Sequence, residues 1–157
     1  MMLLVEFPDG RILACKANMS NIPLAMDTPV RDVIFTLNKL TSSTNSIIPA
    51  SYPGKLQLDR VALIGHSLGG ATAAQAMLND TRFAGGLNFD GSLHGSVMQQ
   101  GLDRLFIGFG QTDVAGPGYE TWNETWPHLR DFGMQLQLKD SLYLTFSDLP
   151  IRFCAIG

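Results

Sequence analysis

Residues 61–70 constrain the fold more than any other part of the sequence. A short apolar run, Val-Ala-Leu-Ile, leads directly into Gly65-His-Ser-Leu-Gly69, and 71–78 continue as a helix-forming segment. A strand, a sharp turn and a helix in this order hold the central serine, Ser67, in a strained backbone conformation. We expect glycine-sized neighbours at both ends of the motif to be needed for that conformation. The sequence therefore predicts a nucleophile elbow, in which the positive end of the helix dipole faces the Ser67 hydroxyl.

Strand-like and helix-like segments alternate after residue 60. The expected strands are 60–64, 85–89, 104–109 and 134–139, and the expected helices are 68–78 and about 120–131. Strands that alternate with helices form mainly parallel sheets with right-handed crossovers. We see no internal repeat and no domain boundary, so we predict one α/β domain over residues 1–157.

The upstream part of the chain predicts a hairpin and a helix. Two strand-like runs, 3–7 and 11–15, flank the turn signal Pro8-Asp-Gly10. Thr28 and Pro29 are typical of a helix N-cap and of the first helical position. Apolar residues then recur at helical spacing, at Val30, Val33, Ile34 and Leu37. We expect this helix to begin at Thr28 and to pack its apolar face on the sheet.

Composition and charge exclude several classes of protein. The chain has 157 residues, 45% of them apolar, which is enough for one globular core. Its net charge is −3 and its Lys and Arg residues are scattered, so no basic stripe indicates nucleic-acid binding. No apolar run is long enough to cross a membrane, and residues 1–7 reach Glu6 too early for a signal peptide. Cys15 and Cys154 either pair or stay free, so they leave the compartment open.

A serine nucleophile needs a histidine base, and the histidine needs a carboxylate to orient it. After an elbow of this kind the chain order is serine, then acid, then histidine. Asp90 is our first candidate for the acid, because it ends the strand after the elbow and should share a sheet edge with Ser67. Asp113, after the strand at 104–109, is the second candidate. The alternative for Asp90 is a cap on a turn or on the next helix.

The histidine of such a triad is expected near residues 140–148, and that segment contains none. His66 precedes the nucleophile and should point away from its hydroxyl, so we expect it to serve packing or a loop hydrogen bond. His128 follows Trp126-Pro and is expected to be structural. His94 lies four residues after Asp90 and stays open as an alternative base.

Several aromatic side chains are candidates for an acyl pocket. They are Phe109, Tyr119, Trp122 and Trp126. Such residues more often pack in a core, and we favour that interpretation over a pocket.

Motifs across nearly the whole chain resemble one family. They are Phe7-Pro-Asp-Gly10, Asp27-Thr-Pro-Val-Arg-Asp32, Gly65-His-Ser-Leu-Gly-Gly-Ala-Thr-Ala-Ala74, Asn88-Phe-Asp-Gly-Ser92, Gly101-Leu-Asp-Arg104, Trp126-Pro-His-Leu-Arg130 and Phe146-Ser-Asp-Leu-Pro150. Together they resemble the platelet-activating factor acetylhydrolase-like α/β-hydrolases, the fungal members above all. The resemblance implies an α/β-hydrolase fold, Ser67 as nucleophile and Asp90 rather than Asp113 as acid. It also implies hydrolysis of short or oxidised acyl esters of phospholipids without a metal or a cofactor.

The sequence departs from that family at the base. The family string His-x-Thr/Ser-Phe-Ser/Thr-Asp matches Tyr143-Leu-Thr-Phe-Ser-Asp148, with tyrosine in the place of histidine. A neutral phenol with a pKa near 10 does not shuttle a proton at pH 7 as imidazole does. Loss of a triad member typically lowers the rate by several powers of ten.

A second departure concerns the start of the sheet. The resemblance begins just upstream of the elbow, so the family's first strands and the loop with its second oxyanion donor have no counterpart. We expect the Leu68 N–H to remain as one donor, and losing the other elsewhere lowers the rate roughly 10²–10³-fold. The run 61–64 is then expected to form an exposed apolar edge that favours self-association.

Two functions follow from these observations. The first is a serine carboxylester hydrolase that forms an acyl-enzyme on Ser67, with Asp90 orienting the base and the Leu68 N–H stabilising the oxyanion. Its substrate is expected to be a phospholipid or small ester. The second is an impaired or inactive relative, either a lipid-binding module, a partner subunit or an incomplete gene product, because Tyr143 stands where histidine is expected.

Overall fold

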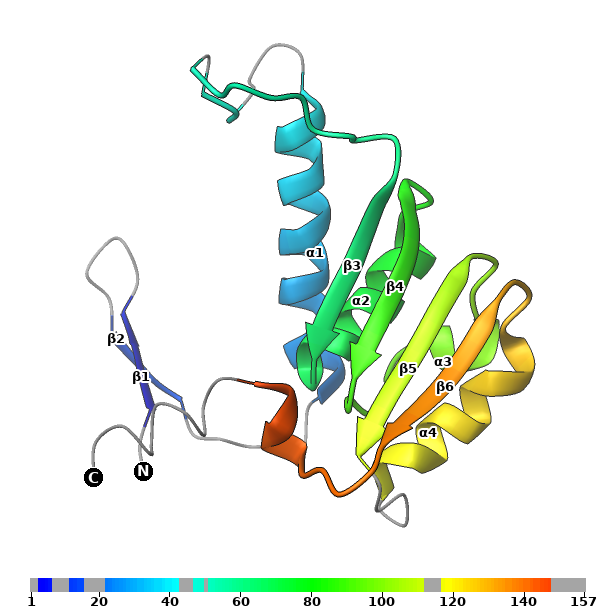
Figure 1. Ribbon diagram of the computed structural model, residues 1–157. Coiled ribbons are helices and arrows are strands. Elements are labelled where there is room, and N and C mark those ends of the chain that lie inside the picture. The colour runs from blue at the N-terminus through cyan, green and yellow to red at the C-terminus, as the bar shows by residue number, and fades with distance from the viewer. Residues whose placement is uncertain are drawn as a thin grey trace.

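The computed structural model describes residues 3–6, 12–15, 22–42, 47–49, 51–111 and 117–147. Its centre is a four-stranded parallel sheet in the order β3-β4-β5-β6 (Figure 1). The strands are β3 (Val61–His66), β4 (Phe83–Phe89), β5 (Leu105–Gln111) and β6 (Gly133–Leu138). The predicted α/β class with a mainly parallel sheet is therefore confirmed. Each strand was expected within about two residues of its observed bounds.

Helices cover one face of this sheet. The helical elements are α1 (Ile22–Thr41), α2 (Leu68–Asn79), α3 (Val97–Gln100), α4 (Pro117–Thr125) and the 3-10 turns η2 (Trp126–His128) and η3 (Tyr143–Phe146). In Figure 1, α2, α3 and α4 lie behind the strands, and α1 packs against α2. The predicted hairpin is also present as β1 (Leu3–Glu6) paired antiparallel with β2 (Ile12–Cys15), while its expected turn at 8–10 lies outside the described residues.

Helix α1 begins earlier than predicted. Its first residue is Ile22, six positions before Thr28, and Pro29 lies inside the helix. Met26 is 4% exposed and Val30 is 3% exposed, so the apolar face extends a full turn upstream of the proline. Burial of this extra turn outweighs the loss of one helical hydrogen bond at the proline.

The helix expected over 120–131 is instead split. It ends as α4 at Thr125 and continues as the turn η2, in which Pro127 stands near the start. Proline lacks a backbone N–H and disfavours the α conformation of the residue before it, which explains the break.

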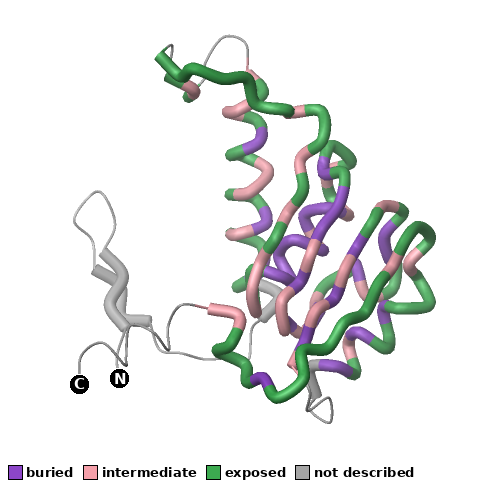
Figure 2. Tube along the Cα trace, in the orientation of Figure 1, coloured by how far each residue is buried: buried purple, intermediate pink, exposed green. Residues whose placement is uncertain are grey.

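The core lies between the sheet and the helices that cover it, with α2 at its centre. Its most buried members include Ala71, Ala74, Met77, Phe83 and Phe106 (Figure 2). A glycine of the sheet lets α2 approach the strands closely, because a side chain at Gly86 of β4 would collide with Met77 of α2 and with Phe106.

The other face of the sheet is largely apolar and open among the described residues. Side chains exposed by more than a third on it include Ile64, Leu105, Met134, Leu136 and Leu138. Strand β3 is the outermost strand at one side of the sheet. No helix of the described part of the chain is long and apolar enough to span a membrane.

Candidate active site

Ser67 lies in the turn between β3 and α2. Its backbone has φ 58° and ψ −124°, a conformation that residues other than glycine rarely adopt. The Ser67 N–H donates to the Phe89 carbonyl at 2.8 Å, and the Ser67 carbonyl accepts the N–H groups of Gly70 and Ala71 at 2.9 and 3.2 Å. Sheet and helix thus hold this residue from both sides, as the strand-turn-helix pattern predicts.

The glycines that permit this turn differ in part from those expected. A Cβ at Gly65 would overlap the backbone of Gly69, so only glycine lets the helix pass the strand here. At Gly69 itself an added Cβ meets nothing within 4 Å, so the expectation of a size limit at this position is wrong. The second close approach is at Gly70, where a Cβ would overlap the side chain of the fully buried Asn88.

Asp90 follows directly on the neighbouring strand. Strand β4 pairs Phe89 with His66, which places Asp90 beside Ser67 at the C-terminal edge of the sheet. Asp90 also has a positive φ of 53°, and its N–H donates to the Phe109 carbonyl at 3.0 Å. The next helix, α3, begins only at Val97, so Asp90 does not cap it. The other candidate acid, Asp113, lies outside the described residues.

The two oxygens of the Asp90 carboxylate have different surroundings. Oδ1 accepts the Tyr119 hydroxyl at 2.6 Å and the Gln111 N–H at 3.2 Å. Oδ2 is buried and has no hydrogen-bond donor among the described residues. Burial, followed by the hydrogen bond to Asp90, raises the pKa of Tyr119 well above its usual value, so the phenol stays a donor at neutral pH.

Tyr143 reaches the nucleophile from the turn η3. Its hydroxyl donates a hydrogen bond to the Ser67 Oγ, although its side chain is 42% exposed. The turn is fastened at two points. His66 Nε2 lies 3.1 Å from the Tyr143 carbonyl oxygen, and the two rings are 4.7 Å apart. Phe146 packs on Phe89 and Phe109, each with ring centroids 5.4 Å away.

The histidines lie where the sequence predicts, with one alternative left unsupported. His66 makes the expected loop hydrogen bond, and His128 belongs to the exposed turn η2. His94 is half-buried, and burial lowers the pKa of its imidazole. No hydrogen bond joins His94 to Ser67 or to Asp90, all three of which the structure describes, so the geometry does not support His94 as the base.

Leu68 is the first residue of α2. The N–H groups of a helix's first turn have no partner within the helix, and they point towards the space in front of it. That position is compatible with the expected role of the Leu68 N–H as an oxyanion donor, which stays a prediction.

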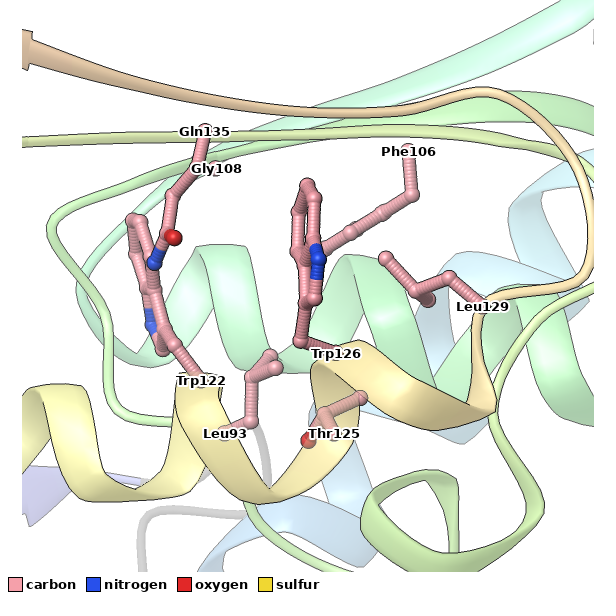
Figure 3. Close-up of a pocket in the computed structure, with 8 residues that line it drawn as sticks. All are labelled: Leu93, Phe106, Gly108, Trp122, Thr125, Trp126, Leu129 and Gln135. Atoms are coloured by element: carbon pink, nitrogen blue, oxygen red, sulfur yellow. The ribbon is translucent and has the colours of Figure 1, made fainter.

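The aromatic side chains do not form one acyl pocket. Trp122 and Trp126 line a cavity between α4 and the strands, with Leu93, Phe106 and Leu129 among its other walls (Figure 3). The cavity has room for only a water molecule or two, too little for an acyl chain. Tyr119 and Trp122 are buried against strand glycines, and Phe109 instead contacts Phe146. The described geometry therefore fits packing, the interpretation favoured above.

Two residues of the site escaped the sequence analysis. Tyr119 was considered only as a pocket or core residue, and Gln111 was not singled out. The signal for Gln111 was its place at the C-terminal end of β5, on the same sheet edge as Ser67 and Asp90. The described residues contain no group of three His, Cys, Asp or Glu side chains able to hold a metal ion.

The chain is similar to known esterases in sequence and in structure. A family model described as platelet-activating factor acetylhydrolase, isoform II, matches residues 32–100. A protein of Arthroderma benhamiae named probable 1-alkyl-2-acetylglycerophosphocholine esterase is 26% identical over 168 residues, which cover 98% of this chain and 40% of the relative. A solved structure of a ferulic acid esterase from Streptomyces cinnamoneus superposes with a TM-score of 0.74 at 28% identity, covering 98% of this chain and 44% of that one. The chain thus spans less than half the length of either protein. In sequence and fold it is similar to the platelet-activating factor acetylhydrolase-like α/β-hydrolases, as its motifs predict.

Proposed function

We propose that the chain is a serine carboxylester hydrolase that cleaves short acyl esters, phospholipid esters among them, through an acyl-enzyme on Ser67. The observation that carries the proposal is the placement of three residues at one sheet edge. Ser67 stands in a strained turn at the start of α2, Asp90 directly follows the next strand, and the side chain at position 143 contacts the Ser67 Oγ.

The proposed reaction has two steps. The Ser67 Oγ attacks the acyl carbon, its proton passes to the leaving alcohol, and the ester bond breaks to leave an acyl group on the serine. Water then attacks that acyl group, the bond from the acyl carbon to the Ser67 Oγ breaks, and the carboxylic acid leaves while a proton from the water returns to the Ser67 Oγ. The Leu68 N–H stabilises the oxyanion in both steps, helped by the positive end of the α2 dipole.

Position 143 sets the rate of the proposed reaction. Because the Tyr143 hydroxyl donates to the Ser67 Oγ, it does not take up the serine proton in this arrangement. A neutral phenol is also a far weaker base than a neutral imidazole, which takes up a proton with a pKa of about 6.5. We therefore expect slow acylation and slow turnover, limited by proton transfer.

The substrate class rests on the comparisons. The names of the two similar proteins describe an acetylglycerophosphocholine esterase and a ferulic acid esterase, both of which act on carboxylic esters. A short acyl ester is the substrate that the family resemblance implies, and Ser67, which would attack it, is half-buried. No cofactor is needed for this chemistry.

A second candidate function is a relative that binds esters without turning them over. The hydrogen bond from Tyr143 favours it, since the bond occupies the nucleophile with a donor in the place of a base. An ester bound over the N-terminus of α2 would then stay intact.

Covalent modification of Ser67 distinguishes the two functions. We would incubate the folded chain with a fluorophosphonate probe, using Ser67→Ala as the matched control, and read the adduct by intact mass. The proposal expects an adduct on the parent chain alone and a slow release of 4-nitrophenol from 4-nitrophenyl acetate. Equilibrium binding of a short-chain phospholipid without an adduct or product would instead support the binding function.

A further inference from the structure

The Asp90 carboxylate is held on one side only. Both of its donors, the Tyr119 hydroxyl at 2.6 Å and the Gln111 N–H at 3.2 Å, converge on Oδ1. Oδ2 is buried, and no described residue donates a hydrogen bond to it. Buried acceptors without a partner are rare in native structures, so this oxygen requires an explanation.

The side chain at position 143 supplies the explanation. A phenol has one hydrogen to donate, and the hydrogen of Tyr143 goes to the Ser67 Oγ. An imidazole has two ring nitrogens, so one can face the serine while the N–H of the other donates to a carboxylate. Oδ2 has no donor among the described residues, so it is an acceptor of the kind that such an N–H requires.

Tyr119 is built into the fold rigidly enough to fix the carboxylate. It is 8% exposed, its hydroxyl lies tightly over Gly110, and its ring meets the Trp122 ring edge-on at 5.1 Å. A side chain at Gly110 would overlap the Tyr119 hydroxyl, so the approach of α4 to β5 depends on that glycine. The phenol therefore reaches Asp90 with little freedom to move.

We infer that Tyr119 is a positioning residue for the proposed reaction. Together with the Gln111 N–H it binds Oδ1 of Asp90 and so leaves Oδ2 for the N–H of the base. This inference rests on the proposed function and adds to it a residue of α4, 29 positions away from Asp90. It also explains why both described donors to Asp90 bind the same carboxylate oxygen, Oδ1.

The test uses the full chain with Tyr143→His, in which an imidazole can meet Oδ2. In that background we would compare Tyr119→Phe with Tyr52→Phe, which removes the same hydroxyl from an exposed tyrosine outside the site. Circular dichroism and thermal melting would check that each variant is folded. Hydrolysis of 4-nitrophenyl acetate would give kcat and KM separately.

Tyr119→Phe is expected to lower kcat about tenfold and to leave KM within about twofold, while Tyr52→Phe changes neither. A further variant tests whether the effect passes through the carboxylate. After Asp90→Asn, the same Tyr119→Phe change should lower kcat no further. A merely structural role predicts an equal loss with and without the carboxylate.

The outcomes separate the inference from the function beneath it. If Tyr143→His hydrolyses the ester and Tyr119→Phe leaves its kcat unchanged, the inference is overturned and the proposed function stands. If the losses from Tyr119→Phe and Asp90→Asn simply multiply, the inference is overturned as well. If folded Tyr143→His neither hydrolyses the ester nor reacts with the fluorophosphonate, the proposed function fails and the inference falls with it.

Discussion

The Tyr143 hydroxyl donates a hydrogen bond to the Ser67 hydroxyl across 76 residues of sequence. The contact does not depend on the phenol alone, because the turn that carries it is fastened independently by His66 and by Phe146. The backbone at position 143 is therefore held at the nucleophile whichever side chain it bears. In the proposed function, this hydrogen bond places a donor where the base of a triad is expected.

This relationship makes Tyr143→His the most direct test of the site. The imidazole is expected to accept the Ser67 proton on one nitrogen and to donate to Asp90 Oδ2 from the other. We predict a gain of a hundredfold or more in kcat/KM for a short-chain ester, part of what a triad member contributes. Tyr143→Phe serves as the control, since it removes the hydroxyl without adding a base. A folded Tyr143→His chain without any gain would show that the nucleophile and the acid are not placed for catalysis.

The two glycines of the Gly65-to-Gly69 motif are predicted to respond oppositely to alanine. At Gly65 the new methyl group would overlap the backbone of Gly69, and we expect a loss of about 3 kcal/mol in the free energy of unfolding. At Gly69 the methyl group meets open space within a helix, so Gly69→Ala should be neutral or stabilising by up to about 1 kcal/mol. Urea unfolding of both variants measures the difference. Equal losses at the two positions would contradict the close approach of α2 to β3 at Gly65.

Much of the fold was predictable because its signals are local. Alternating apolar segments predicted the strands to within about two residues, and the turn motif predicted a strained backbone at Ser67, which is observed as a positive φ. The start of α1 was missed because burial of Met26 extends the helix upstream of the start signal at Thr28 and Pro29. Tertiary contacts decide such cases, and a single sequence does not display them.

The positions of the candidate site residues were also predictable in part. Strand ends bring Ser67 and Asp90 to one edge by topology alone, and the family string assigned position 143 a place beside the nucleophile. The core position of Tyr119 was predicted, but its contact with Asp90 was not, because the two residues lie 29 positions apart on different elements. No periodicity or spacing in the sequence connects α4 to that carboxylate.

The ionisation of the Tyr119 phenol can be followed by its absorbance at high pH, without an activity assay. Burial and the hydrogen bond to Asp90 raise the pKa of Tyr119 above its usual value near 10, so the folded state favours the protonated phenol. The resulting stability is present below pH 10 and is lost as the pH rises through the folded-state pKa. At pH 11 we expect the folded chain and Tyr119→Phe to have equal absorbance at 295 nm, and unfolding in urea to reveal one more phenolate in the parent. A difference already present in the folded proteins would contradict the buried contact with Asp90.

The last prediction concerns the edge strand β3. Ile64 of β3 is 70% exposed, and the neighbouring open face of the sheet is apolar, which favours association between copies of the chain. Ile64→Lys should lower self-association in sedimentation velocity runs at increasing concentration, and should change the free energy of unfolding by less than about 0.5 kcal/mol. Phe35→Lys is the matched control. Phe35 is 58% exposed on α1, so this substitution adds the same charge away from β3. If the two substitutions lower association equally, net charge rather than the sheet edge governs it, and a parent chain that stays monomeric throughout would contradict the prediction.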